Sequence, residues 1–218
     1  MVAPSEHSID TKNRILDAAE RLFADKGFDA TSLRMITTAA EVNLAAVNYH
    51  FQSKETLLQA VYARRSAPVN AKRLELLTQF ESSGEPLEVE QILDALIRPL
   101  FEIGESRECV PRLMVRLLYL DAHEASRNVF QQQFHQVLIR FQGALRKSLP
   151  HLSEKEITAR MQFSIGSLAH TMAASRNLQA MPAGGQMKEA LPWVLRQLIH
   201  YIAAGLRAPA LEESACTF

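Results

Sequence analysis

Apolar residues recur at three- and four-residue spacing along most of the chain, as they do on one face of an α-helix, and strand-like alternation is missing. The first such repeat covers residues 11–26 and ends at Gly27, because glycine adopts the left-handed conformation that closes many helices. Two shorter helices are predicted at residues 32–40 and about 44–51, with a tight turn between them. Three short helices, the last two joined by a turn, predict a helix-turn-helix.

Polar residues and prolines mark the expected helix ends. Thr31 is suited to cap the second helix, and Ser53 to cap a longer fourth one, because their hydroxyls accept from free backbone amides. Pro68 lies inside the fourth pattern and predicts a kink or a restart, since it has no backbone donor.

Further amphipathic helices follow a polar loop at residues 81–86. Pro99 predicts a late kink in the first of them, and Pro111 opens a strongly apolar segment at residues 113–120. Ser153 and Glu156 have the spacing of a capping box before a later helix. The last helix follows a polar, glycine-containing loop at 183–186 and stops at Pro209.

These patterns predict an all-α protein with an N-terminal three-helix helix-turn-helix domain and a larger C-terminal helical domain, with about nine helices in all. We place the helix-turn-helix domain at residues 11–65 and the larger helical domain at residues 66–207. Residues 1–10 and 208–218 are expected to be flexible tails.

Composition narrows this picture only slightly. Lys and Arg (24) balance Asp and Glu (24), so the overall charge does not indicate a nucleic-acid partner. Cys109 and Cys216 show no metal or redox spacing, and neither a signal peptide nor an apolar run of membrane-spanning length is evident. We therefore expect a cytoplasmic protein that needs no cofactor or metal and has no membrane partner.

The third helix has the composition of a DNA-reading helix. Leu44 and Val47 are predicted to anchor it, while Ala45 and Ala46 let the backbone approach base edges and contact a thymine methyl. Asn48 carries the donor–acceptor pair that reads adenine. A helix that only filled a core would not be expected to carry Asn43, Asn48, Tyr49 and His50 within eight positions.

The order of these residues resembles the DNA-binding domain of TetR-family transcriptional regulators. The resemblance covers residues 12 to about 62, and within it residues 42–51 are similar to a fatty-acid-responsive repressor of the family. It rests on Arg14-Ile15-Leu16-Asp17-Ala18-Ala19, Leu22-Phe23, Gly27-Phe28, Thr31-Ser32-Leu33-Arg34, Ile36, Ala40, Val42, Tyr49-His50-Phe51, Ser53-Lys54-Glu55 and Leu57-Leu58.

The resemblance implies roles for several side chains. Tyr49, His50 and Lys54 match positions that grip phosphates beside the groove. Their alternative roles are a packing aromatic for Tyr49, a cap of helix carbonyls for His50 and an ordinary solvated lysine for Lys54.

At the start of the second helix, Thr31 and Ser32 match positions where free amides and the helix dipole favour a phosphate. Arg34 matches a position that reaches a base or the backbone. Many family members carry Gly in the third helix where this chain has Ala45 or Ala46, so the operator sequence cannot be carried over.

Beyond about residue 66 the chain resembles the family's variable ligand-binding and dimerisation domain. The resemblance implies a homodimer on double-stranded operator DNA, because a two-fold operator needs two reading heads. We expect the last two helices to form the dimer seam, with burial inside the monomer as the alternative for each residue: Ile165, Leu168, Met172, Trp193, Leu195, Leu198 and Ile202.

We predict a pocket for a small apolar effector between the helices of this part, because Met and Phe side chains suit an adaptable apolar site. An ordinary core is the alternative for each lining residue: Leu96, Leu100, Met114, Leu117, Leu118, Phe134, Leu138, Phe141, Met161 and Phe163. Arg116 and His170 are candidates to meet a ligand carboxylate. Alternatively, Arg116 pairs with Asp121 or a helix end, and His170 lies in the interior or the dimer seam.

Three other functions are compatible with parts of the sequence. An enzyme is disfavoured, because no hydrolase, nucleotide-binding or metalloprotease motif occurs, and Asp121 and His123 are too close in sequence to share a helix face. A redox switch at Cys109, near a predicted helix start, is the second, and neutral burial of that thiol is the simpler reading. Transcriptional activation is the third, because the position of the operator decides it.

Overall fold

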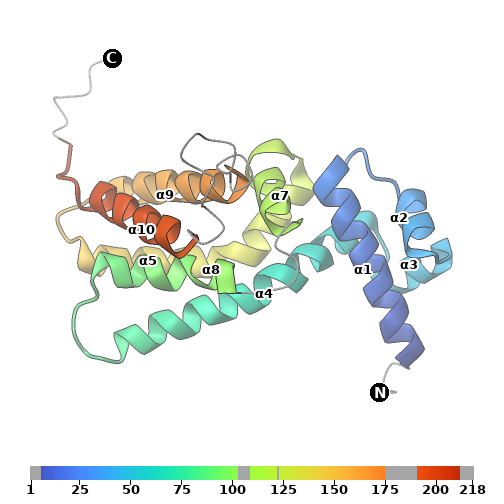
Figure 1. Ribbon diagram of the computed structural model, residues 1–218, viewed down its shortest axis with the longest axis horizontal. Helices are drawn as coiled ribbons and strands as arrows, with labels where there is room; N and C mark the ends of the chain where they lie inside the picture. Colours follow the sequence, from blue (N-terminus) through green and yellow to red (C-terminus); the bar gives the residue numbers. More distant parts are fainter. Residues whose placement is uncertain (1–5, 103–108, 122, 175–190, 212–218) are drawn as a thin grey trace, which may run out of the picture. The chain divides into compact units, whose positions relative to one another are not determined.

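The computed structural model describes residues 6–102, 109–121, 123–174 and 191–211, and all regular structure in these ranges is helical (Figure 1). The all-α prediction is therefore confirmed for the described residues. The loop expected at 183–186 and residues 212–218 of the expected C-terminal tail lie outside them. The helices are α1 (Glu6–Lys26), α2 (Leu33–Ala40), α3 (Leu44–Phe51), α4 (Lys54–Glu81), α5 (Val89–Ile97), α6 (Pro99–Glu102), α7 (Cys109–Val115), the π-helical segment η1 (Arg116–Leu120), α8 (Glu124–Ser148), α9 (Glu154–Ala174) and α10 (Leu191–Arg207).

The chain divides into two compact units. The first, here the head unit, comprises Met1–Pro68 and Glu105–Phe134, and the second, the effector unit, comprises Val69–Gly104 and His135–Phe218. Helices α4 and α8 each contribute to both units. The segment 105–134, which the sequence analysis assigned to the C-terminal domain, thus groups with the N-terminal helices.

The head unit has one apolar core. Helix α1 packs against α2, α3 and α7, and α2 packs against α3. The core combines buried side chains of α1–α4 with three from the later segment, Leu113, Leu117 and Val129. The helix-turn-helix therefore shares its core with a segment that lies far beyond it in sequence.

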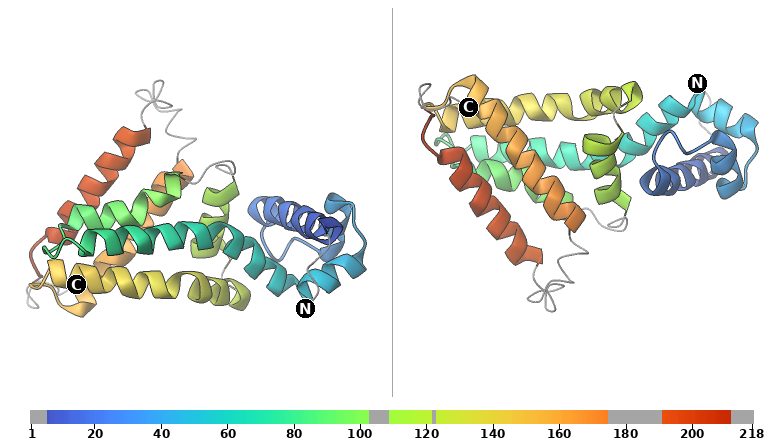
Figure 2. Two further views of the ribbon diagram at one scale, coloured as in Figure 1. Left: turned by 90° about the horizontal axis from the view of Figure 1, so that it is seen from below. Right: turned by 90° about the horizontal axis from the view of Figure 1, so that it is seen from above.

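The effector unit is built around α5 and α10. Helix α10 lies beside both α5 and α9 (Figures 1 and 2). Apolar residues at helical spacing supply the buried side chains of this unit, among them Leu77, Ile92, Leu93, Ile97, Phe141, Leu198 and Ile202.

Local signals set most helix ends where they were predicted. Gly27 has φ +83° and donates its N–H to the carbonyl of Phe23 at 3.0 Å, which closes α1. The Ser53 hydroxyl accepts from the backbone N–H of Thr56 at 3.1 Å. The capping box is also present: the carboxylate of Glu156 accepts from the N–H of Ser153 at 3.0 Å, and Ser153 Oγ accepts from the N–H of Glu156 at 3.2 Å.

Some local expectations were not met. Residues 6–10, expected in a flexible tail, are helical, because a formed helix extends at little cost. Helix α4 continues through Pro68, so the restart considered at that position is not observed. Ser32 rather than Thr31 caps α2, accepting from the N–H of Met35 at 3.2 Å.

Candidate nucleic-acid interface

Helix α3 presents a clear division between a buried and an exposed side. Val47 and Phe51 are buried in the core of the head unit. Leu44 is 51% exposed, so its predicted role as an anchor is wrong. Leu44 is the first residue of α3 and lies one turn before both Val47 and Asn48, so its position at the end of the helix leaves it exposed. The exposed residues form one stripe, here named the reading face: Leu44, Ala45, Asn48 and Tyr49.

The turn before α3 is fixed by its own side chains. Asn43 Oδ1 accepts from the backbone N–H of Ala46 at 2.9 Å, so Asn43 caps the helix and only its amide nitrogen remains for other contacts. Ala46 is half-buried against the core, unlike the exposed Ala45. Of these three predicted DNA-binding residues, only Ala45 has a fully exposed position without a structural task.

At the start of α2 the two adjacent hydroxyl residues have opposite environments. Thr31 is completely buried, and its hydroxyl donates to the carbonyls of Gly27 at 2.7 Å and Leu22 at 3.2 Å. Its side chain is therefore not available to DNA, because it is turned back toward the end of α1. Ser32 and Arg34 are exposed, and Arg34 has no ion-pair partner among the described residues.

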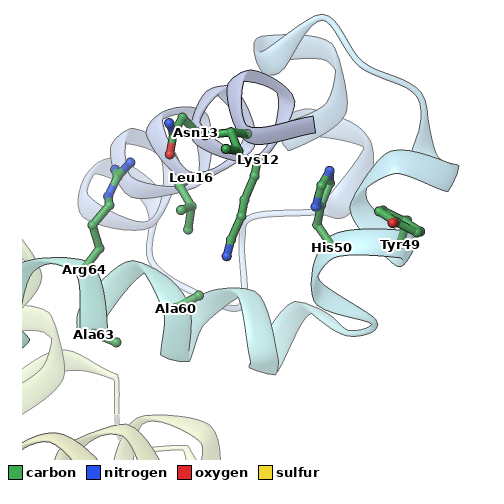
Figure 3. A pocket seen from close by; sticks show the side chains of 9 residues that line it. Lys12, Asn13, Leu16, Tyr49, His50, Ala60, Ala63 and Arg64 are labelled. Atoms are coloured by element: carbon green, nitrogen blue, oxygen red, sulfur yellow. The ribbon is translucent and has the colours of Figure 1, made fainter. Parts of the chain in front are cut away.

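Tyr49 and His50 border a groove between α1, α3 and α4 (Figure 3). Tyr49 is 79% exposed, which excludes a role as a core aromatic, and its ring stands edge-on to His50 with centroids 5.0 Å apart. The groove has a volume of about 630 Å³. Its floor is apolar and carries small side chains, including Ala60 and Ala63.

Lys12 also lines this groove, and its side chain extends from α1 toward the α4 side in Figure 3. The second cation of the groove, Arg64, is neutralised by Asp17 at 2.7 Å and by the buried Glu20. Lys12 has no such acidic partner in the described part of the chain. Sequence reasoning missed Lys12, because a lysine on the polar face of a helix carries no signal of its own.

Lys54 is held against an aromatic ring. Its Nζ lies 4.1 Å from the ring centroid of Phe28, a cation–π contact. Partial burial lowers the pKa of Lys54, while Asp29 and Glu55 act in the opposite direction. Lys54 is thus a positioned cation at the start of α4 rather than a freely solvated lysine.

Arg116 of η1 binds the carboxyl end of α1. Arg116 donates from Nε to the carbonyl of Ala24 at 2.9 Å and from Nη2 to that of Asp25 at 2.7 Å, and Nη1 lies 3.6 Å from Asp121. A Cβ at Gly27 would come within 2.6 Å of Arg116 Nη1. The alternative in which Arg116 pairs with Asp121 and a helix end is therefore observed. Its donors face α1, so it does not fit the role of ligand contact.

Further contacts join the same segment to the head unit. Arg112 pairs with Asp25, and the Tyr62 hydroxyl donates to the carbonyl of Leu113 at 2.8 Å. Burial raises the pKa of Tyr62, so this phenol stays protonated and remains a donor. These residues together are here named the junction: residues 112–121, His123, the end of α1 and Phe28.

His123 completes the junction. Its ring lies 4.6 Å from that of Phe28, and its Nδ1 accepts from the backbone N–H of Ser126 at 3.1 Å, which caps α8. Asp121 and His123 thus have structural partners, and no group of metal-binding side chains occurs among the residues that the structure describes.

The residues predicted to line an effector pocket lie in both units. In the head unit, Leu117 belongs to the core, with Met114 and Phe134 packed against it. In the effector unit, Phe141 and Met161 are buried, His170 is exposed, and three others are half-buried: Leu96, Leu100 and Leu138. Phe163 is 72% exposed, so its expected place in an interior pocket is wrong.

The residues of the predicted dimer seam differ in burial, and Ile165 and Leu195 are half-buried. Leu168, Met172, Leu198 and Ile202 are buried within the chain itself, which is the alternative considered for them. The outer sides of α9 and α10 instead expose three large side chains, Phe163, Trp193 and Tyr201. Phe163 and Tyr201 were not expected there. When a helix has apolar residues on two sides, their spacing does not show which side faces the core.

Family models match both parts of the chain. Residues 15–61 match bacterial regulatory proteins of the tetR family, and residues 94–205 match the tetracyclin repressor-like C-terminal domain. The chain belongs to the TetR family. Members and relatives of the TetR family are transcriptional regulators rather than enzymes. No helix in the described ranges is both long and apolar enough to cross a membrane.

Curated relatives align mainly over the head. The chain is 38% identical over 80 residues to the HTH-type transcriptional regulator AcrR of Shigella flexneri, which is 37% of this chain and 36% of AcrR. It is 30% identical over 87 residues to the A-factor receptor protein of Streptomyces griseus, 40% of this chain and 28% of that protein. These alignments therefore span well under half of each relative.

Solved structures share the fold over nearly the whole chain. A Shewanella sp. PV-4 protein assigned to the tetR family matches with a TM-score of 0.60 and 20% identity, over 93% of this chain and 99% of that one. The multidrug binding protein EbrR matches with a TM-score of 0.54 and 18% identity, over 91% and 96%. At these identities the likeness establishes the fold alone.

Proposed function

We propose that this chain is a transcriptional repressor that binds a two-fold operator as a homodimer and leaves it when a small apolar effector binds. The observation that carries the proposal is the reading face of α3. Its four side chains are exposed on one side of a helix whose other side is buried and whose first turn is capped by Asn43.

The reading face has the chemistry of direct base readout in the major groove. The exposed Asn48 amide can donate to and accept from one adenine edge. Leu44 and Ala45 offer apolar contact to a thymine methyl one turn earlier. Sequence preference is therefore assigned to Leu44, Ala45 and Asn48.

Phosphate contacts are assigned to side chains around this face. The exposed Tyr49 hydroxyl, His50 and Lys12 converge on one groove, and Lys54 lies at the start of α4. Ser32 and Arg34 flank the face at the start of α2. Such contacts fix register on the duplex and make binding depend on salt.

For release we propose a two-state dimer, in which the effector binds one state more tightly than the other. Two structural features support transmission to the head. Helices α4 and α8 are continuous through the boundaries between the units, and the junction ties the segment before α8 to the end of α1.

The DNA-binding part of the proposal is tested by two substitutions that should change specific and non-specific DNA affinity differently. With full-length protein and its own promoter fragment, Asn48→Ala should lower affinity for the operator but not for unrelated DNA. Lys54→Gln should weaken both about equally. If Asn48→Ala leaves the ratio of specific to non-specific binding unchanged, the assigned reading face is wrong.

The release mechanism needs a separate measurement. A compound that binds the protein should lower operator affinity in the same preparation, because unequal affinity for two states requires it. A compound that binds and leaves operator affinity unchanged contradicts the mechanism for that compound.

A further inference from the structure

One arginine lies in the interior of the effector unit. Arg73 on α4 is only 5% exposed. Its Nε donates to the carbonyl of Leu96 at 2.7 Å, and its Nη1 donates to Asn70 Oδ1 at 2.9 Å. In the described part of the chain, Nη2 has no acceptor and the guanidinium has no carboxylate partner.

Other arginines of this unit are paired although they are more exposed. Arg98 pairs with Asp94, Arg140 with Glu81, Arg146 with Glu154, Arg160 with Glu156, and Arg207 with Glu88 and Glu90. The described acidic side chains in these pairs are therefore engaged elsewhere. Among the buried and half-buried arginines that the structure describes in this unit, Arg73 is the one without a counter-charge.

A buried charge without a partner opposes folding unless something compensates it. Burial lowers the pKa of Arg73 to about 10, so the guanidinium remains positive at neutral pH. The bond to Leu96 explains only one donor: α5 ends at Ile97 before Pro99, which leaves a last-turn carbonyl for Arg73 to cap. Capping requires a donor but not a full buried positive charge.

We propose that the effector carries an anionic group, a carboxylate on an apolar body, and that this group pairs with Arg73. The inference rests on the proposed function and specifies the chemical class of its effector. Arg73 contacts Leu96, which the sequence analysis placed in the effector pocket, and its unit provides half-buried and buried apolar side chains such as Leu138 and Phe141.

The two residues that the sequence suggested as contacts for a ligand carboxylate do not fit this role. Arg116 binds the carbonyls at the end of α1, and His170 is exposed. Arg73 was missed because it occurs in an ordinary helical pattern, and only the fold shows that it is buried without an acid.

The test uses delipidated full-length protein and matched pairs of ligands: straight-chain carboxylates from octanoate to palmitate and the alcohols of equal length. A carboxylate of suitable length should bind, raise the thermal midpoint and release operator DNA, whereas its alcohol should bind at least about thirtyfold more weakly. Arg73→Gln, which keeps a donor for Leu96, should abolish this difference between acid and alcohol. Arg140→Gln, an exposed paired arginine of the same unit, should preserve it.

Each outcome decides the proposal. Equal binding of acid and alcohol to the wild type, no binding of any of them, or unchanged discrimination in Arg73→Gln overturns it. If Arg73→Gln is unstable, Arg73→Lys keeps the charge and must keep the preference for the acid. Operator binding without ligand is recorded for every variant, so a failure of DNA binding, which concerns the proposed function, is distinguished from a failure of effector recognition.

Discussion

Single polar side chains of the head unit divide into those that hold the backbone and those that remain free. Thr31 and Asn43 satisfy helix ends through their oxygens. Lys12 and Tyr49 have exposed polar groups around one groove. Affinity for DNA should therefore respond to the second set directly and to the first set only through folding.

Lys12→Gln should weaken binding to specific and unrelated DNA alike, because it removes a phosphate contact. A dimer loses two such contacts, so the slope of log affinity against log salt should fall by about 2. Lys26→Gln, which removes an exposed lysine at the other end of the same helix, is the control and should bind like the wild type. An unchanged salt slope in Lys12→Gln would remove Lys12 from the interface.

Gly27→Ala should destabilise the protein by about 1–3 kcal/mol, because it combines a left-handed backbone with a close approach to Arg116. Gly84→Ala is the matched control, since Gly84 has φ +75° but nothing within 4 Å of the added methyl group. Urea unfolding should show the larger loss for Gly27→Ala. Equal losses would mean that Arg116 moves aside freely.

At this scale the sequence indicated candidate residues for the interface but not how their side chains are oriented. Thr31 and Ser32 are adjacent hydroxyl residues, and only the carbonyls of α1 decide that Thr31 turns inward. Leu44 was expected inside because it is apolar, yet it is the first residue of α3 and lies beyond the part of the helix that the core covers.

At the scale of helices, ends with a local cause were predictable and long-range associations were not. Gly27, Ser53 and the Ser153–Glu156 box act within one turn, so their signals are visible in sequence. The continuity of α4 through Pro68 was not evident from the sequence. The junction depends on contacts such as Arg116 with Ala24, 92 positions apart, which periodicity does not encode.

Ion pairs between helices of the effector unit should make its stability depend on acid pH. The hydrogen bond from Arg140 to Glu81, and that from Arg207 to Glu90, lower the pKa of both carboxyl groups below the usual 4.5. A carboxyl whose pKa is depressed on folding stabilises the protein above its unfolded pKa, and this contribution is lost as the pH falls through the folded value.

The double variant Glu81→Gln/Glu90→Gln should therefore show a smaller fall in thermal midpoint than the wild type as the pH drops below about 4.5. Glu85→Gln is the control, because Glu85 is exposed and has no ion-pair partner in the described part of the chain. Parallel pH curves for wild type and double variant would contradict the role of these two pairs.

At the scale of the whole molecule, operator binding requires two heads. The outer sides of α9 and α10 expose Phe163, Trp193 and Tyr201, an apolar surface of the kind that a second copy would cover. From the sequence we expected α9 and α10 to form the dimer interface. Which side of α10 remains free for it follows only from the packing of α10 against α5 and α9.

Tyr201→Glu, at a side chain that is 69% exposed, should produce a monomer at concentrations where the wild type is a dimer, and operator affinity should fall at least about tenfold. Sedimentation velocity measures the first effect. Ile139→Glu places the same charge on an exposed apolar residue of α8 and should remain a dimer. A dimeric Tyr201→Glu would show that the seam lies elsewhere.

The central claim is that α3 of each protomer enters a groove of duplex DNA with its flanking side chains on the phosphates. The most direct test is the affinity of a folded, dimeric Tyr49→Phe/Lys54→Gln double variant for the protein's own promoter fragment at about 0.15 M salt. The account predicts a loss of at least about tenfold, with a smaller salt dependence than the wild type. Binding as tight as that of the wild type, with the same salt dependence, would contradict it.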